Sequence, residues 1–484
     1  MFNHSRAGLL SRQNKNNKLG EECGIFGGYC KNGDIAPHIK TGLFKLQHRG
    51  QESAGMSTGE ISQILHKSKG LVNEVFDEKS MQKLTGKFGI GHVRYSTQGG
   101  SANVINAQPF LIESFGGQVS VAHNGNIKSA SDIRKTLEKM GENFITDSDS
   151  EVLLKKVAYE LKKSPEKWSF EEIGDCLNKN FSQGAYSVVF YLPNKIIAYR
   201  DPFGYKPLMF CEVEEGFFIA SEDVAFSSLK VEKIIEIKAG WGVEINSNGY
   251  EIKQFSQKNE EKKCIFEHIY FANSASNIFG SNVYESRIAL GKLLAKNDNI
   301  DADVVVPVMN SGIVAAKGYA NESGIPFEIG FKVNNTERSF IQPTQQARIE
   351  TVKEKLTPIK SIVEGKRIVL VDDSIVRGTT SLEVIQMLRT AGAKEIHLRL
   401  SSSMILNTCS WGVDIPTKEE LLAVNYKTEQ EIAKYIGADS VKYLSLGDLK
   451  QHFGEGWCYN CLMTNVEKCG DSKCQQLMKT PALV

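Results

Sequence analysis

Two adjacent carboxylates follow an apolar run in the second half of the chain, where they could hold a metal ion or a sugar. The run Ile368–Val371 consists of branched apolar residues, and Asp372 and Asp373 come directly after it. A loop of small and polar residues, Ser374–Thr380, then leads into a helical pattern. This order predicts ligands at the carboxyl end of a strand and phosphate binding at a helix N-terminus. Carboxylate oxygens bind vicinal sugar hydroxyls or a divalent cation.

A second reactive group is Cys23, which opens an apolar segment after the polar stretch 1–22. Cleavage before Cys23 would give this residue both a thiol and a free α-amine. An α-amine has a pKa of roughly 7.7–8.0, so it can take up the thiol proton near neutral pH. The pattern predicts an N-terminal nucleophile with residues 1–22 as its leader. The alternative is a small cysteine buried in the core.

Four motifs follow Cys23 in the first half of the chain. They are LQHRGQESAG (46–55), GHVRYSTQG (91–99), AHNGNI (122–127) and DSDSE (147–151). Together they resemble the class II, N-terminal-nucleophile glutamine amidotransferases. The resemblance extends from Cys23 to about residue 240 and implies a glutaminase built as an αββα sandwich.

The resemblance implies a role for four residues besides the catalytic Cys23. Arg94 would bind the α-carboxylate of glutamine through its planar guanidinium, and Asp149 would pair with the α-ammonium. The Asn124 side chain and the Gly125 N–H would stabilise the oxyanion, an arrangement that contributes about 3 kcal/mol per donor. Taken alone, Arg94 fits a surface salt bridge equally well, and Asn124-Gly125 fits a tight turn.

Strand and helix patterns alternate in the second half, which predicts a doubly wound parallel sheet. Strands are expected over 303–308, 327–331, 367–371 and 395–400, and helices over 312–323 and 381–391. A further strand is expected to begin at Cys264.

The loop after Val371 resembles the phosphoribosyl pyrophosphate (PRPP) loop of type I phosphoribosyltransferases. With segments 264–287, 304–320 and 338–343, it resembles the amidophosphoribosyltransferase family, the glutamine PRPP amidotransferases of purine synthesis.

This second resemblance implies a PRPP and Mg²⁺ site. Its PRPP-binding residues would be Asp372, Asp373, Ser374, Arg377, Gly378, Thr379 and Thr380. Ser311, Asp372 and Asp373 would surround the Mg²⁺–PRPP complex, and a cation bridging the pyrophosphate oxygens would stabilise the leaving group. Ser311 also suits a helix N-cap.

The implied reaction uses ammonia from glutamine to convert PRPP to 5-phosphoribosylamine, with release of glutamate and pyrophosphate. Two alternatives stay open: a divergent paralogue that keeps the glutaminase but has altered or lost PRPP transfer, and a non-catalytic sensor of PRPP or nucleotides. Departures from the family motivate the first alternative. Asn273–Ala275 replace Arg-Pro-Asp, and the loop 334–337 lacks an Arg, a Tyr and a Gly of the segment that closes over PRPP. Lys206 also replaces an Arg, which we expect to weaken a structural contact in the first half.

The ten cysteines are unevenly placed, and four lie in the tail. The tail cysteines are Cys458, Cys461, Cys469 and Cys474. Their spacing alone allows a local zinc knuckle. The family resemblance instead implies a [4Fe–4S] cluster, for which an all-cysteine ligand set is suited. Its ligands would be Cys264, Cys409, Cys458 and Cys461. Free thiols are the third possibility.

The length of 484 residues predicts two to four domains. We expect a leader (1–22), an amidotransferase domain (23–256), a phosphoribosyltransferase domain (264–450) and a cysteine-containing tail (451–484). Lys and Arg total 58 against 57 acidic residues, which argues against a general nucleic-acid-binding surface.

No apolar run reaches the ~20 residues of a membrane span, and the N-terminus lacks a secretory signal. We therefore expect no membrane partner and a cytoplasmic enzyme with reduced thiols. A homotetramer and feedback inhibition by purine nucleotides are implied by the family resemblance alone.

Overall fold

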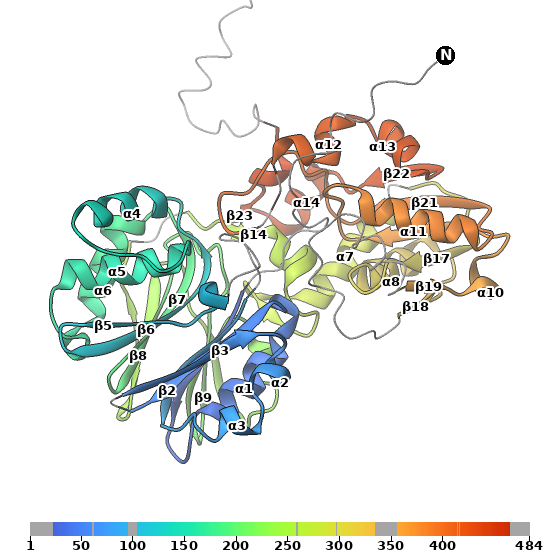
Figure 1. The fold of residues 1–484 in the computed structure, drawn as a ribbon. Coiled ribbons are helices and arrows are strands. Elements are labelled where there is room, and N and C mark those ends of the chain that lie inside the picture. The colour runs from blue at the N-terminus through green and yellow to red at the C-terminus, as the bar shows by residue number, and fades with distance from the viewer. Residues whose placement is uncertain are drawn as a thin grey trace, which may run out of the picture.

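The computed structural model describes residues 23–60, 62–94, 104–257, 260–296, 298–333, 356–413, 415 and 417–464. The leader 1–22, the altered loop 334–337, Cys469 and Cys474 lie outside these residues. The described chain forms two halves that lie side by side in Figure 1. The first half runs from blue to yellow-green and the second from yellow to red.

Two antiparallel sheets form the centre of the first half. The strands of one are β1 (Gly24–Cys30), β2 (Ser53–Gly59), β3 (Gln63–Lys69), β4 (Phe88–Arg94), β9 (Met209–Val213), β10 (Gly216–Ala220) and β11 (Val231–Glu236). Those of the other are β5 (Phe110–Ser114), β6 (Gly117–Asn126), β7 (Ala185–Leu192), β8 (Lys195–Arg200), β12 (Trp241–Asn246) and β13 (Gly249–Gln254). Their orders are β11-β9-β10-β1-β4-β2-β3 and β13-β12-β8-β7-β6-β5.

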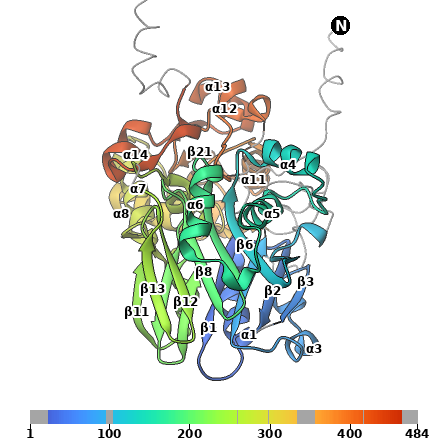
Figure 2. The same cartoon turned by 90° about the vertical axis from the view of Figure 1, so that its left-hand side faces the viewer.

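Helices cover the outer faces of both sheets. They are α1 (Ala36–Lys45), α2 (Val72–Val75) and α3 (Glu78–Met81) on the first sheet, and α4 (Ala130–Lys139), α5 (Asp149–Leu161) and α6 (Phe170–Phe181) on the second. Figure 2 shows α5 and α6 in front of β6 and β8. A third apolar core fills the space between the two sheets. This layering confirms the predicted αββα sandwich.

Strand β7 shows why this layering follows from the sequence. Every residue of the strand is buried. Val188 and Phe190 pack against the helices, whereas Val189 and Tyr191 pack between the sheets. Successive side chains of a strand point to opposite faces, so a continuous apolar run is required where both faces are covered. Burial of each such side chain contributes about 1.5–3 kcal/mol.

The second half is built on a parallel sheet. Its strands, in spatial order, are β17 (Val304–Pro307), β20 (Arg367–Asp372), β21 (Glu395–Leu400) and β22 (Ser440–Tyr443). Its helices are α7 (Val283–Lys296), α8 (Ile313–Ser323), α10 (Lys360–Val363), α11 (Thr379–Thr390), α12 (Leu422–Asn425), α13 (Glu429–Ile436) and α14 (Leu446–Phe453). In β20, Val369 and Val371 face the core with α7 and α8, and Ile368 and Leu370 face the core with α11 and α13. Helices on both faces confirm the doubly wound sheet.

Two strand predictions in this half were wrong. Residues 327–331 form only a single parallel bridge, Val305 to Phe327, and the following strand β18 (Phe331–Val333) pairs with β19 (Leu356–Pro358) instead. The strand at Cys264 is limited to β14 (Lys263–Cys264), and a π-helical turn, Glu267–Phe271, follows it. The turn buries Glu267 and His268 along with its apolar residues, so its polar side chains find partners inside the protein rather than on a solvated strand face.

Short elements complete the described chain. They are β15 (Asn277–Ile278), β16 (Ser281–Asn282), β23 (Trp457–Cys458) and the 3₁₀ turns Gln47–Arg49, Val104–Asn106, Pro165–Lys167, Asp223–Phe226, Lys418–Glu420 and Asn460–Leu462. None of the helices in the described ranges combines the length and the apolar character needed to cross a bilayer.

Candidate functional site

Cys23 lies at the start of β1, between the strands β10 and β4. The register pairs Gly24 with Val93, so one further step along both strands places Cys23 beside Arg94. Cys23 is buried, and its carbonyl accepts a hydrogen bond from Nε of Arg49 at 3.1 Å. The guanidinium of Arg94 lies 3.6 Å from the carboxylate of Glu52. The predicted nucleophile and the predicted carboxylate-binding arginine are therefore neighbours at one end of the first sheet.

Asn124 and Gly125 lie near the end of β6 in the facing sheet. Nδ2 of Asn124 is buried and has no hydrogen-bond partner within the described residues. A buried donor without a partner costs about 1–3 kcal/mol, and an oxyanion that accepted from it would recover this cost. Gly125 has a φ of +145°, and a Cβ there would lie 1.9 Å from the carbonyl oxygen of Ala185. Only glycine fits this position, and because glycine has no side chain, its backbone is not covered by one.

Asp149 begins helix α5 and faces the same strand. Its Oδ2 accepts a hydrogen bond from the N–H of Ile127 at 2.9 Å, and its Oδ1 accepts one from Ser150 Oγ at 3.3 Å. The imidazole of His123 contacts this group, with Nδ1 at 3.0 Å from Ser150 Oγ and 3.9 Å from Asp149 Oδ1. Burial lowers the pKa of His123 even though Asp149 opposes the shift, so this ring is neutral near neutral pH.

Two side chains that the sequence analysis did not single out hold the backbone of His123. Gln108 accepts from the His123 N–H at 2.7 Å and donates to its carbonyl at 3.2 Å. Nε2 of His92 lies 3.1 Å from the same carbonyl. Burial lowers the pKa of His92 to about 3, so it also stays neutral. The motif GHVRYSTQG contains His92, but no pattern marked Gln108.

Arg49 joins the two halves of the protein behind Cys23. Its Nη1 donates to Glu222 at 2.6 Å and to Glu267 at 2.9 Å, and its Nη2 donates to Glu267 at 2.9 Å. All three side chains are fully buried. Burial alone would raise the pKa of Glu222, but His48 and Arg49 hold it well below its ordinary value. Glu267 belongs to the second half, so this cluster connects the backbone of Cys23 to the other half of the chain.

The two carboxylates Asp372 and Asp373 lie where β20 ends and are almost fully buried. Ser311, which follows the neighbouring strand β17, donates from Oγ to Asp372 Oδ1 at 2.9 Å. The Asp373 N–H donates to the same oxygen at 2.9 Å, and Ser374 Oγ donates to Asp373 Oδ1 at 2.5 Å. The structure thus brings Ser311 and the acidic pair together, as parallel strands require at their carboxyl ends.

The loop after the acidic pair ends in a helix N-terminus. Gly378, with a φ of +82°, is the N-cap of α11, and Thr379 and Thr380 form its first turn. Their backbone N–H groups offer donors to a phosphate. Arg377 points elsewhere, because its Nε and Nη2 donate to Glu420 Oε2 at 2.9 and 2.6 Å. A role for Arg377 in PRPP binding would require this pair to separate.

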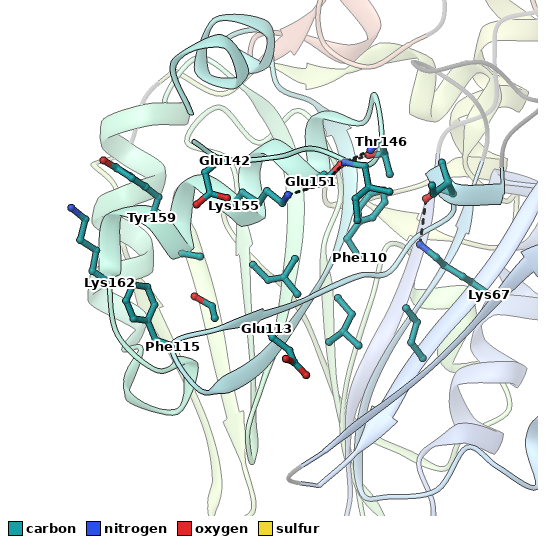
Figure 3. Close-up of a pocket in the computed structure, with 17 residues that line it drawn as sticks. Lys67, Phe110, Glu113, Phe115, Glu142, Thr146, Glu151, Lys155, Tyr159 and Lys162 are labelled. Atoms are coloured by element: carbon teal, nitrogen blue, oxygen red, sulfur yellow. Dashed lines mark hydrogen bonds and ion pairs between the residues drawn. The ribbon is translucent and has the colours of Figure 1, made fainter. Parts of the chain in front are cut away.

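A pocket of about 640 Å³ lies between β3, β5 and α5, the helix that begins at Asp149. Figure 3 shows Glu151 in its wall, bonded to Thr146 and Lys155. Burial lowers the pKa of Lys67, on the opposite wall, to about 8. None of the lining residues is a predicted catalytic, glutamine-binding or PRPP-binding residue. The pocket therefore does not coincide with the predicted chemistry.

The four predicted cluster cysteines come from three segments that meet near Tyr205. Cys264 and Cys458 are register partners on β14 and β23. Burial and the thiols of Cys458, Cys409 and Cys264 raise the pKa of Tyr205. The carbonyl of Cys461 accepts hydrogen bonds from the N–H groups of residues 406 and 407. Yet no three His, Cys, Asp or Glu side chains in the described ranges are gathered so that they could hold a metal ion. The thiols share a region without forming a completed ligand set.

Comparison with known proteins identifies both halves. Residues 92–228 match the model of a glutamine amidotransferase domain, and residues 284–401 match that of a phosphoribosyl transferase domain. The amidophosphoribosyltransferase of Methanocaldococcus jannaschii is 44% identical over 459 residues, covering 91% of this chain and 96% of that protein. The Bacillus subtilis amidophosphoribosyltransferase is 40% identical over 452 residues, covering 92% and 93%.

A solved structure agrees with these matches over both halves. The B. subtilis glutamine PRPP amidotransferase, complexed with ADP and GMP, superposes with a TM-score of 0.82 at 38% identity. The alignment covers 91% of this chain and 96% of that one. The two-part architecture and the order of the motifs are therefore shared along nearly the whole length. This chain belongs to the amidophosphoribosyltransferase family, as its motifs predicted.

Proposed function

We propose that the protein converts PRPP to 5-phosphoribosylamine with ammonia drawn from glutamine, releasing glutamate and pyrophosphate. This is the first step of de novo purine synthesis, and it makes the protein a glycosyltransferase with glutamine amidotransferase activity. The observation that carries the proposal is the buried Nδ2 of Asn124, a donor kept without a described partner on the sheet that faces Cys23. Such a donor is what an oxyanion requires.

Glutamine hydrolysis begins at Cys23. After removal of the leader 1–22, the α-amine of Cys23 takes the thiol proton, and the thiolate attacks the side-chain amide carbon. Asn124 Nδ2 and the Gly125 N–H stabilise the oxyanion. As the intermediate collapses, the α-ammonium returns its proton to the leaving nitrogen, and ammonia departs. Water then hydrolyses the thioester, which releases glutamate and restores the thiol. Arg94 and Asp149 hold the two charged groups of glutamine during both steps.

Ammonia then reaches the second half through the interior of the protein and attacks C1 of PRPP. The C1–oxygen bond to pyrophosphate breaks, and loss of one proton gives 5-phosphoribosylamine. Asp372 and Asp373 bind the ribose hydroxyls, and the N–H groups of Thr379 and Thr380 bind the 5-phosphate. Ser311 and the acidic pair supply the oxygen ligands that Mg²⁺ prefers. A Mg²⁺ ion held there supplies charge neutralisation on the pyrophosphate.

Cys264, Cys409, Cys458 and Cys461 would hold a [4Fe–4S] cluster. The pairing of Cys264 with Cys458 supports this assignment, as does the proximity of Cys264, Cys409 and Cys458 to Tyr205. The all-cysteine donor set also suits such a cluster. Iron, sulfide and zinc analysis of protein purified without oxygen tests the assignment. Iron and sulfide in equal amounts are expected, and zinc without sulfide would overturn it.

Further features are proposed from the family relationship. We place the domains at 23–256 and 264–450, the mature N-terminus at Cys23, and the enzyme in the cytoplasm as a homotetramer. Purine nucleotides are proposed as inhibitors, since the related B. subtilis structure holds ADP and GMP. N-terminal sequencing of the purified protein tests the processing site. A chain that retains Glu22 would lack the α-amine on which the mechanism depends.

One assay separates this function from its alternatives: release of glutamate and of pyrophosphate, measured together with PRPP present and absent. The proposal predicts PRPP-dependent release of both products in a one-to-one ratio. Glutamate without pyrophosphate would favour the paralogue that has lost PRPP transfer. The departures at Asn273–Ala275 and in the loop 334–337 motivate that alternative. Absence of both products would favour the non-catalytic sensor.

A further inference from the structure

A turn from the second half, Cys409–Gly412, packs against the strand that carries the oxyanion donors. Gly412 has a φ of +106°, and a Cβ added to it would lie 3.1 Å from the carbonyl carbon of Gly125 and 3.2 Å from its Cα. The carbonyl of Ser410 accepts a hydrogen bond from Nδ2 of Asn126 at 2.9 Å. The turn therefore touches Gly125 directly and is bonded to the residue that follows it.

The turn is itself held firmly by the first half. The Trp411 ring stacks on Tyr205, with centroids 4.8 Å apart and planes 15° apart. The ammonium of Lys128 lies 6.0 Å from the centre of the Trp411 ring. Cε of the buried Lys206 lies 3.3 Å from the same added Cβ on Gly412. Stacking and cation–π contacts of this kind are attractive and restrict the position of the ring. Together they fix where Gly412 meets Gly125.

Gly125 needs such support. It pairs with Tyr186 of β7 but has no side chain to anchor it, and an oxyanion donor must be correctly placed before the reaction begins. A displacement of about 1 Å can lower a rate by roughly 10²-fold. We propose that the Cys409–Gly412 turn is a positioning element for the oxyanion hole, so that the second half of the chain sets the geometry of glutamine hydrolysis. The proposal rests on the glutaminase function assigned to Cys23.

The test compares Gly412→Ala with Gly324→Ala in the full-length mature enzyme. Both glycines have positive φ, but a Cβ at Gly324 meets no atom within 4 Å. Both substitutions therefore strain a backbone with positive φ (+106° at Gly412 and +74° at Gly324), and only the first also pushes on Gly125. We expect Gly412→Ala to lower kcat for glutamate release from glutamine by about 10–100-fold, with little change in KM. Pyrophosphate release with ammonia in place of glutamine should be unchanged, and Gly324→Ala should behave as the parent in both assays.

A second pair of variants covers the case in which Gly412→Ala does not fold. Trp411→Ala removes the stacking on Tyr205 and should lower the same kcat several-fold, whereas Trp411→Phe keeps an aromatic ring there and should recover most of it. An unchanged kcat in both Gly412→Ala and Trp411→Ala, or a rise in KM alone, would overturn the inference while leaving the proposed function in place. A parent enzyme that releases no glutamate would overturn the proposed function itself, and the inference with it.

Discussion

Replacement of Arg49 by methionine should strongly lower the free energy of unfolding, because two buried carboxylates would lose the cation that they share. Arg49 donates to both Glu222 and Glu267 at 2.6–2.9 Å, and all three side chains are inaccessible to solvent. Removing one partner of a buried ion pair costs about 3–5 kcal/mol, mainly because the remaining charge stays desolvated. We expect a loss of this size in the free energy of unfolding of Arg49→Met near neutral pH.

The loss of stability in Arg49→Met should become smaller as the pH falls. The folded-state pKa of Glu222 is held below its ordinary value of 4.5, so its ionised form stabilises the fold above about pH 4.5 and this contribution is lost as the pH falls. The difference between the parent and Arg49→Met should therefore be largest near neutral pH and should narrow in acid. Adding Glu267→Gln to Arg49→Met should restore part of the stability, because one uncompensated charge is removed.

Urea unfolding followed by circular dichroism measures these differences. Lys163→Met is the control, since it removes a pair with Glu172 in which both side chains are one-third or more exposed, and such pairs contribute about 0–1 kcal/mol. A loss in Arg49→Met no larger than in the control would refute the reasoning. So would strict additivity of Arg49→Met and Glu267→Gln, because that would show that the two charges do not interact.

Three further outcomes are expected. Cys23→Ser should abolish glutamate release while leaving ammonia-dependent pyrophosphate release near the parental rate, measured in parallel assays. Asp372→Asn should lower PRPP turnover by at least about tenfold through loss of sugar and Mg²⁺ contacts, without abolishing basal glutamate release. Between about pH 6.5 and 3, His92 is protonated in the unfolded chain but not in the folded chain. The free energy of unfolding should therefore fall by about 1.4 kcal/mol for each pH unit over this range. Urea titrations at about pH 7 and about pH 5 should show a smaller fall for His92→Gln than for the parent.

Local sequence patterns predicted the elements on either side of the acidic pair closely. The strand expected over 367–371 is β20, Arg367–Asp372, and the helix expected over 381–391 is α11, Thr379–Thr390. Apolar periodicity and turn residues act within a few positions, so they can be read from one stretch of chain. The same signals predicted a longer strand at Cys264 than the structure contains. A short apolar run that is buried on several sides fits a strand and a helical turn equally well.

Contacts between distant segments could not be predicted in this way. Arg49 and Glu267 are 218 residues apart, and no sequence pattern around either residue indicates that it pairs with the other. Gln108 holds His123 through ordinary amide hydrogen bonds, which leave no distinctive spacing. The pairing of Arg377 with Glu420 likewise depends on how α11 and the 3₁₀ turn at Lys418–Glu420 pack. Motifs located the reactive groups, whereas the residues that orient them became visible only in the fold.

The contact between Gly125 and Gly412 also has a consequence for biosynthesis. The ribosome makes Gly125 about 290 residues before Gly412, which at roughly 5–20 residues per second is a delay on the order of 15–60 s. A nascent or prematurely terminated chain can contain Cys23, Asn124 and Gly125 and still lack the turn that contacts Gly125. Such a chain should hydrolyse little glutamine. Under the proposed mechanism, incomplete molecules that have no acceptor for ammonia would therefore release little of it.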